Sequence, residues 1–259
     1  MTYSSSLNLS EKTAVVIGGT SGIGLTLAKG LAQAGANVVP TGRRADLVES
    51  AAEAVRKTGR RSLSLTSDVN DSASLQALLD ATVKEFGGVD ILVNSAGRTK
   101  RTPTLQLPES EWDEILETNL NGTLRACQIF GRYMVEHKYG RIINIASLSS
   151  FVALYEVAAY AASKAAVASL TKSLAIEWAR NGVCVNAIAP GVFRTALNAA
   201  LLDGTPRGQE FLLRTPMKRF GQQEELIGAA VFLASDAASF VTGHILAVDG
   251  GFLASGVNQ

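Results

Sequence analysis

Short apolar runs rich in β-branched residues alternate with longer amphipathic segments along almost the whole chain. The amphipathic segments carry apolar residues at helical spacing, and many of them end just before a glycine, as helix C-caps favour. Strands are predicted at residues 13–18, 37–41, 62–66, 90–94, 141–146, 183–189 and 245–248. Helices are predicted at residues 23–34, 45–57, 72–86, 109–137, 157–180 and 224–235.

This alternation also predicts how the sheet is built. Strands that read as continuous apolar runs are buried on both faces, and βα order with such strands predicts a parallel sheet. No repeat, low-complexity tract or linker interrupts the order. We therefore expect residues 1–259 to form one α/β domain, a doubly wound parallel sheet of about seven strands with helices on both faces.

Two features disturb the pattern. Pro40 lies inside the second predicted strand and removes a ladder donor, so this strand should end or bend there. Residues 192–223 break the rhythm with closely spaced glycines and prolines. Because so long a loop in a compact domain is usually a functional lid or disordered, we predict a substrate lid in this segment.

Composition and charge exclude several classes of protein. The hydrophobic fraction of 47% excludes disorder for most of the chain, and 24 Lys and Arg against 23 Asp and Glu leave no basic field for nucleic acid. Only Cys127 and Cys184 occur, without metal-ligand spacing, so neither a disulfide framework nor a metal site is expected. The first residues do not resemble a signal peptide, and no run matches a membrane span. We expect a cytoplasmic protein with no membrane partner.

A glycine-rich turn, Gly-Gly-Thr-Ser-Gly-Ile-Gly, follows the first predicted strand and leads directly into a helix. Glycines at such a turn let the backbone approach a pyrophosphate, and the helix N-terminus offers free N–H groups. The spacing also suits a tight structural turn, but its place in a βαβ unit favours a dinucleotide site. The candidate cofactor contacts in this turn are Gly18, Thr20, Ser21, Gly22, Ile23 and Gly24.

The residues after the second predicted strand bear on which dinucleotide is bound. They read Thr41-Gly42-Arg43-Arg44, and no acidic residue occurs before Asp46. An acid at this place would accept bonds from a ribose 2′-hydroxyl, whereas an arginine would pair with a 2′-phosphate. Arg43, with Arg44 beside it, therefore favours NADP(H), while solvated arginines at a helix start would leave NAD(H) as the alternative.

Candidate catalytic side chains gather at the same edge of the sheet. Tyr160 and Lys164 are four residues apart in a predicted helix and share one face, so we expect the ammonium to lower the pKa of the phenol from ~10. Ser147 directly follows the strand at 141–146, and Asn94 ends the preceding strand. The carboxyl ends of parallel strands are where such sheets bind ligands.

Together these motifs resemble the short-chain dehydrogenase/reductase family, from Gly18 to the C-terminal Asp249-Gly250-Gly251. The resemblance implies a Rossmann-type fold and a catalytic tetrad of Asn119, Ser147, Tyr160 and Lys164. It implies further cofactor contacts at Asp68, Val69, Asn94, Ala96, Gly97, Tyr160, Lys164, Pro190, Gly191, Val192 and Thr195. Ile17 and Ser95 depart from the family pattern, and each removes a side-chain hydrogen bond.

The mechanism that the resemblance implies divides the work among these four residues. Tyr160 would transfer a proton to or from the substrate oxygen, and Ser147 would hydrogen-bond that oxygen. Lys164 would bind the nicotinamide ribose and lower the pKa of Tyr160. Asn119 would hold a water that extends the proton path.

The substrate is the least determined part of this interpretation. Arg98, Lys100 and Arg101 form a cationic loop that suits a carboxylate or phosphate clamp, or simply a solvated loop, and Arg101 joins Ser147 and Tyr160 as a candidate substrate contact. The loop is similar to that of sugar-acid and polyol members such as gluconate 5-dehydrogenase-like enzymes. The scaffold also resembles 3-oxoacyl-carrier-protein reductases, and the apolar lid would suit a hydrophobic substrate.

Two further expectations follow from the resemblance. A non-catalytic, cofactor-sensing protein on this fold would have lost Ser147, Tyr160 or Lys164, and all three are present. Assembly as a homotetramer or homodimer is expected through the two long helices predicted at 109–137 and 157–180 and the last strand. Burial of these helices within one subunit would explain their apolar residues equally well.

Overall fold

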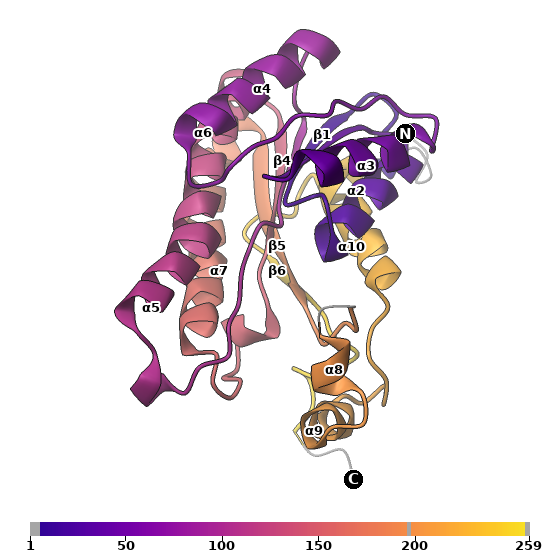
Figure 1. Ribbon diagram of the computed structural model, residues 1–259. Helices are drawn as coiled ribbons and strands as arrows, with labels where there is room; N and C mark the ends of the chain where they lie inside the picture. The colour runs from indigo at the N-terminus through magenta and orange to yellow at the C-terminus, as the bar shows by residue number, and fades with distance from the viewer. Residues whose placement is uncertain (1–5, 196–197, 257–259) are drawn as a thin grey trace.

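The computed structural model describes residues 6–195 and 198–256 (Figure 1). In this part of the chain six strands form one parallel sheet in the order β2-β1-β3-β4-β5-β6. The chain passes outward from β1 to β2 and then returns to the other side of β1, so the topological switch point lies between β1 and β3. The predicted doubly wound α/β fold is confirmed. The strands are β1 (Thr13–Ile17), β2 (Asn37–Thr41), β3 (Ile91–Asn94), β4 (Gly140–Ile145), β5 (Val183–Pro190) and β6 (Ile245–Val248).

The seventh predicted strand, at 62–66, is not a strand in the structure. The segment runs beside β2, where the Val38 amide donates to the Arg61 carbonyl at 3.1 Å and the Ser67 amide donates to the Gly42 carbonyl at 3.0 Å. A regular ladder would need a donor at residue 40, two positions after Val38, and Pro40 has none. The strand β2 itself continues through Pro40 to Thr41. Proline therefore interrupts pairing with the neighbouring segment and not the strand.

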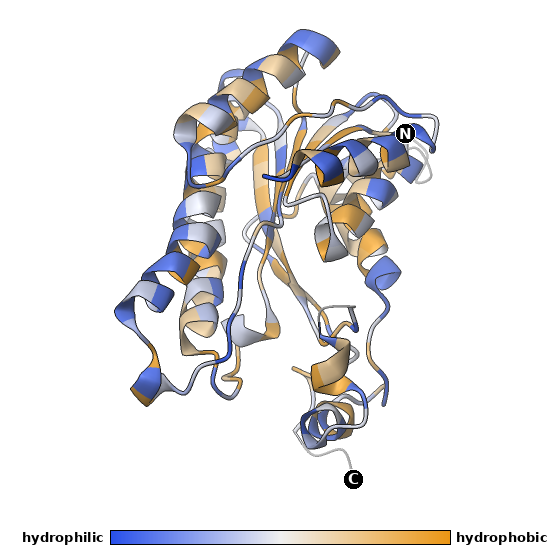
Figure 2. Cartoon of the chain, in the orientation of Figure 1, coloured by the Kyte–Doolittle hydropathy of each residue, from blue (hydrophilic) through white to orange (hydrophobic). Residues whose placement is uncertain are grey.

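Helices cover both faces of the sheet, and apolar residues, orange in Figure 2, lie along the strands and on the inward sides of the helices. Alternate residues of β1 point to opposite layers: Ala14 and Val16 pack with α2 and α10, and Val15 and Ile17 pack with α4, α6 and α7. This two-sided burial explains why the strands read as continuous apolar runs. The helices are α2 (Gly22–Gln33), α3 (Ala45–Arg56), α4 (Ser72–Phe86), α6 (Gly122–Glu136), α7 (Ala158–Trp178) and α10 (Ile227–Ala234).

The helix predicted at 109–137 is divided in the structure. It consists of α5 (Glu109–Leu116), a π-helical segment (Glu117–Asn121) and α6. Such π segments are frequent at functional sites, and this one contains Asn119. Short 3₁₀ turns occupy Thr104–Gln106, Leu148–Ser150, Ala179–Asn181, Gln223–Leu226 and Asp236–Ala238. No helix in the described ranges combines the length and apolarity needed to cross a bilayer.

The segment at 192–223 carries its own helices, α8 (Ala199–Leu202) and α9 (Pro206–Arg214), and we call it the lid segment. Both helices lie beyond the carboxyl ends of β5 and β6 (Figure 1). A parallel bridge between Phe193 and Gly221 ties the two ends of the segment together, and Arg194 pairs with Asp203 at 2.6 Å. Residues 196–197 lie outside the described residues. The bridge and the ion pair are contacts within the lid segment that hold its described residues together.

Candidate active site

The glycine turn after β1 packs backbone against backbone. Gly18 has a φ of +76°, and a Cβ there would lie 2.5 Å from the Ala96 amide nitrogen. A Cβ on Gly24 would lie 2.1 Å from the Gly18 carbonyl oxygen. Only glycine fits at these two places, so the turn is held close to the end of β3.

The same turn leaves open space in front of α2. No atom lies within 4 Å of the place where a Cβ on Gly22 would stand, and the Ser21 side chain caps none of the first N–H groups. Thr20 and Ile23 flank this opening in the chain. Free N–H groups at a helix N-terminus beside open space fit a pyrophosphate.

Two arginines follow β2 next to this turn. A Cβ on Gly42 would lie 3.2 Å from the Thr20 hydroxyl, so the chain enters Arg43 and Arg44 directly beside the turn. Both side chains are exposed, and within the described residues neither makes an ion pair or a side-chain hydrogen bond. Two unpaired guanidinium groups at this place fit a 2′-phosphate.

The proposed adenine contacts lie where the extended segment beside β2 ends. The Asp68 carboxylate accepts a hydrogen bond from the Asn70 amide at 3.0 Å, and the Asp68 amide donates to the Ser74 hydroxyl at 3.1 Å. Val69 is buried against Gly122, whose missing side chain leaves it room. These contacts fix the turn, and the role of both residues at the adenine stays a prediction.

Asn94 belongs to a buried polar chain that joins the sheet to α7. Its amide donates to the Asn144 oxygen at 2.9 Å, and Asn144 in turn donates to the Thr171 hydroxyl at 3.0 Å. Next along the chain, Gly97 lies close to two tetrad residues: a Cβ there would lie 3.3 Å from the Asn119 amide oxygen and 3.6 Å from the Lys164 nitrogen. The segment from Asn94 through Ala96 to Gly97 therefore leads from the sheet to the candidate tetrad.

Asn119 is completely buried and fully engaged. Its oxygen accepts from the Arg98 amide at 2.8 Å, while its nitrogen donates to the Arg98 carbonyl at 2.9 Å and to the Ser163 hydroxyl at 3.0 Å. Ser163, which the sequence reasoning missed, donates to the Tyr160 carbonyl at 2.7 Å. The only available signal was a small polar residue between Tyr160 and Lys164. Asn119 thus joins the loop after β3 to the turn of α7 that carries Tyr160.

Ser147, Tyr160 and Lys164 come together at the end of β4. Ser147 follows the strand, and its hydroxyl hydrogen-bonds the Tyr160 phenol. Lys164 is buried, donates to the Ile145 carbonyl at 2.6 Å, and has its nitrogen 5.8 Å from the centre of the Tyr160 ring. The predicted neighbourhood of the three side chains is present in the structure.

The electrostatics of this group differ from the sequence expectation. Burial raises the pKa of Tyr160, and the hydrogen bond from Ser147 only partly opposes this. Burial lowers the pKa of Lys164 to about 8. Its ammonium donates to the Ile145 carbonyl at 2.6 Å and does not contribute to the shift in the pKa of Tyr160. The expectation that Lys164 lowers the pKa of Tyr160 is therefore wrong for the protein alone.

The segment after β5 is pinned to β6 and to the lid segment. A Cβ on Gly191, after Pro190, would lie 2.5 Å from the Asp249 Cα, and the Gly191 amide donates to the Val248 carbonyl at 2.8 Å. The Val192 carbonyl accepts from Gly221 at 2.9 Å, and the Thr195 amide donates to the Asn198 side chain at 2.7 Å. These bonds hold the segment beside the carboxyl edge of the sheet.

The cationic loop after β3 is paired with carboxylates. Arg98 contacts Glu114 at 2.8 Å, Lys100 contacts Glu111 at 2.5 Å and Arg101 contacts Glu156 at 2.6 Å. Arg98 and Lys100 thus pair with carboxylates of α5. Arg101 instead pairs with Glu156, which precedes α7 and Tyr160 in the chain. All three cations are therefore paired, and the binding of a substrate carboxylate by this loop stays a prediction.

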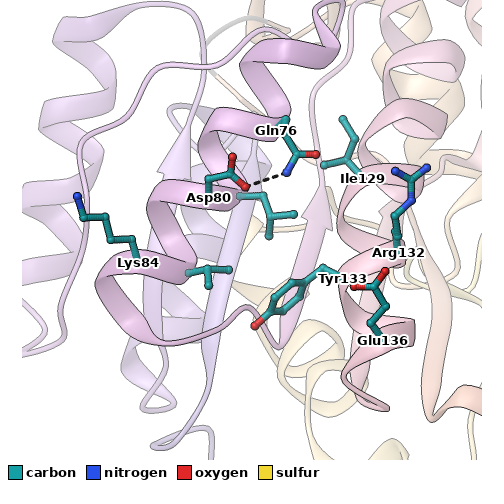
Figure 3. A pocket seen from close by; sticks show the side chains of 9 residues that line it. Gln76, Asp80, Lys84, Ile129, Arg132, Tyr133 and Glu136 are labelled. Carbon is teal, nitrogen blue, oxygen red and sulfur yellow. Dashed lines mark hydrogen bonds between the residues drawn. The ribbon is translucent and has the colours of Figure 1, made fainter.

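Two cavities lie outside the tetrad. One of about 430 Å³ lies between α4 and α6 (Figure 3), where Gln76 donates to Asp80 at 2.8 Å, and it contains no predicted site residue. Another of about 230 Å³ lies beside the lid segment and includes Val192. No group of three or more His, Cys, Asp or Glu side chains that could hold a metal ion occurs in the described part of the chain.

Known proteins resemble this chain over nearly its whole length. A family model described as enoyl-(acyl carrier protein) reductase matches residues 18–253. The chain is 40% identical to gluconate 5-dehydrogenase of Gluconobacter oxydans, over 98% of this chain and 100% of that protein. It is 45% identical to 2-dehydro-3-deoxy-D-gluconate 5-dehydrogenase of Bacillus subtilis, over 95% and 96%. A crystal structure of a gluconate 5-dehydrogenase from Burkholderia cenocepacia in complex with NADP and tartrate superposes with a TM-score of 0.93 at 40% identity, covering 97% of this chain and 98% of that one.

Proposed function

This chain belongs to the short-chain dehydrogenase/reductase family, and we propose that it is an NADP(H)-preferring oxidoreductase that interconverts a secondary alcohol and a ketone of a sugar acid. The observation that carries the proposal is the meeting of Ser147, Tyr160 and Lys164 at the carboxyl end of β4. They lie on the edge that also holds the glycine turn, as ligand sites in doubly wound sheets do.

The residues present fit the cofactor. The N–H groups of α2 beside Gly22 would receive the pyrophosphate, and Arg43 with Arg44 would pair with the 2′-phosphate. Solved structures of relatives that carry NADP support the preference for NADP(H) over NAD(H). When bound, this cofactor supplies or accepts the hydride.

The protein handles the proton. Because burial raises the pKa of Tyr160, its phenol stays protonated at neutral pH and can donate to a ketone oxygen during reduction. The Ser147 hydroxyl, which donates its single proton to the phenol oxygen in the protein alone, would turn that proton to the ketone oxygen as negative charge develops there. Lys164, with a pKa of about 8, can return a proton to the Tyr160 phenolate near neutral pH. Asn119 would act by fixing the loop after β3, since its side chain is already engaged.

Sugar acids are the best supported substrates. The two relatives compared above are named for gluconate and 2-dehydro-3-deoxy-D-gluconate, and the Burkholderia enzyme was crystallised with tartrate, itself a hydroxy acid. Arg101 lies on the loop between this edge and Glu156 and would face an anionic substrate. The acyl-carrier-protein wording of the family model supports the alternative, a 3-oxoacyl-carrier-protein reductase.

One panel of substrates separates these functions. The purified protein is mixed with 5-keto-D-gluconate or with an acetoacetyl thioester, each with NADPH and with NADH, and cofactor consumption is followed by absorbance. We expect consumption with 5-keto-D-gluconate and a preference for NADPH. Consumption with the thioester alone would establish the alternative, and none with any carbonyl would favour a cofactor-sensing protein.

The organisation around the reaction is also part of the proposal. We place residues 1–259 in one domain with the segment at 192–223 as substrate lid, which its own helices and its bridge at Phe193 support. A cytoplasmic location is supported by the two free, buried cysteines. A homotetramer or homodimer is proposed by analogy with the family, and a light-scattering mass of one subunit would refute it.

A further inference from the structure

Arg207, in the first turn of α9, is a half-buried guanidinium without a direct partner. Within the described residues it makes neither an ion pair nor a side-chain hydrogen bond. Its guanidinium lies over the Phe211 ring, 5.3 Å from the centre, which holds the planar group on one side. Burial of a charged group is costly unless hydrogen bonds are made, so this fork of donors is poised for an acceptor.

The charges that act on Arg207 come from the other side of the carboxyl edge. Arg101, after β3, lowers the pKa of Arg207, whereas Glu156, before α7, raises it. Glu210, the neighbouring acid on α9 itself, is already paired with Arg214 at 3.2 Å. Arg101 and Glu156 therefore lie near enough to Arg207 for their charges to act on it, although they come from segments far apart in sequence.

The cluster of Arg101, Glu156 and Arg207 is positively charged, and contacts with its surroundings fix the first two residues. Arg101 contacts Glu156 through its Nε at 2.6 Å and lies 5.7 Å from the centre of the Tyr155 ring. Glu156 is mostly buried and its carbonyl accepts from the Thr102 amide at 2.9 Å, which fixes its place. Arg101 and Arg207 together with Glu156 carry a net charge of +1, and some of their guanidinium N–H groups have no acceptor among the described residues. A second carboxylate would neutralise this charge and accept hydrogen bonds from these groups.

We propose that Arg207 is a substrate-binding residue of the lid segment and that, with Arg101, it binds the carboxylate of the sugar acid. The inference rests on the proposed function and adds the residue that selects acids over neutral sugars. A planar guanidinium binds a carboxylate through two parallel hydrogen bonds, which a lysine cannot reproduce. The bound carboxylate would also draw α9 toward the loop after β3, so substrate charge would help to hold the lid segment.

The test compares Arg207→Ala, Arg207→Lys and Arg214→Ala with wild type. Arg214 lies on the same helix, carries the same charge and pairs with Glu210, so Arg214→Ala controls for the loss of one cation from α9. Each protein is assayed for kcat and KM with 5-keto-D-gluconate and NADPH. Separately, tartrate is titrated into each protein with NADP present, by calorimetry, which does not depend on turnover.

We expect Arg207→Ala to raise KM and the tartrate Kd roughly 10- to 100-fold with little change in kcat, as for a lost charged hydrogen bond. Arg207→Lys should fall between, and Arg214→Ala should match wild type. Arg207→Ala values equal to those of Arg214→Ala would overturn the inference. If wild type does not reduce the sugar acid, the proposed function fails, and the tartrate titration still decides whether Arg207 binds a carboxylate.

Discussion

Replacement of Gly22 by alanine tests whether the glycine turn holds a pyrophosphate. Gly22 is the first residue of α2, its φ is +51°, and no atom lies within 4 Å of a Cβ placed on it. In the protein alone, the new methyl group would therefore meet nothing. It would project into the space beside the free N–H groups of α2, where we place the pyrophosphate.

The two effects of this substitution have different sizes. Placing an L-residue in the left-handed region costs about 1–2 kcal/mol, which for a chain of this length lowers Tm by roughly 2–8 °C. Loss of one or two charge-assisted hydrogen bonds, at about 1.5–3 kcal/mol each, should weaken NADPH binding by at least roughly 10-fold. Binding should thus suffer far more than a small change in stability explains.

Gly59 provides the matched control. It also has a positive φ, +83°, and no atom lies within 4 Å of a Cβ placed on it, but it follows α3, away from the glycine turn. Gly59→Ala should lose similar stability and keep its affinity for NADPH. Gly24→Ala should lose more stability than either, because its Cβ would lie 2.1 Å from a backbone oxygen.

The assay is a fluorescence titration with NADPH beside a thermal melt of each variant. If Gly22→Ala binds NADPH as tightly as Gly59→Ala does, the pyrophosphate is not held at this turn and the reasoning is refuted. Reduced affinity in both variants would point instead to a general loss of structure.

Three further predictions test the proton chemistry and the opposite edge of the sheet. Tyr160→Phe should lower kcat at least about 100-fold and keep NADPH affinity, and near-normal turnover would contradict the proton role. The pKa of Lys164 is lowered from 10.5 to about 8, so between these two pH values the unfolded chain binds more protons than the folded protein. Lys164 therefore destabilises the fold at low pH, and this destabilisation is lost as the pH rises from about 8 to 10.5. Compared with Lys164→Met, wild type should gain about 2 kcal/mol of unfolding free energy from pH 7 to 9.5 in denaturant melts, whereas a constant difference would refute the shift. Lys12 and Arg141 lie 3.8 and 4.6 Å from the centre of the Tyr139 ring. Tyr139→Leu should therefore cost about 1–2 kcal/mol more than Tyr139→Phe in the same melts, and equal losses would exclude a cation–π contribution.

The hydrophobic pattern predicted the six strands of the sheet correctly, because an apolar run is the direct result of burial on both faces. The buried strands read as apolar runs because helices cover both faces, and β1 shows this with Val15 and Val16 packed in opposite layers. The segment at 62–66 has the same apparent pattern, but its backbone bonds to the neighbouring chain lie at Arg61 and Ser67, on either side of it. The deciding residue, Pro40, lies on the neighbouring strand, so a pattern confined to 62–66 could not reveal it.

The sequence indicated which residues are candidates for catalysis, but it did not indicate which atoms their side chains contact. Ser147, Tyr160 and Lys164 lie together as expected, whereas the Asn119 side chain bonds Arg98 and Ser163. The periodic pattern at 109–137 gave no sign of the π-helical segment that carries Asn119. The sequence also could not predict that burial raises the pKa of Tyr160 and lowers that of Lys164. Spacing places Lys164 on the same face of α7 as Tyr160, yet its ammonium donates to the Ile145 carbonyl, at the end of β4.

The lid segment shows how contacts decide between the two substrate classes. Its apolar residues suit an acyl chain when read along the sequence, but Phe193 and Leu202 are buried. The Phe193 ring packs on Gly221, where a Cβ would lie 2.4 Å away, and Phe211 faces Phe252 at 6.3 Å. These side chains hold the segment together, whereas Leu201 and Leu213 of the same segment are exposed. The segment also offers the charge of Arg207, which lies over the Phe211 ring, and it is this charge that favours an acid over an acyl chain.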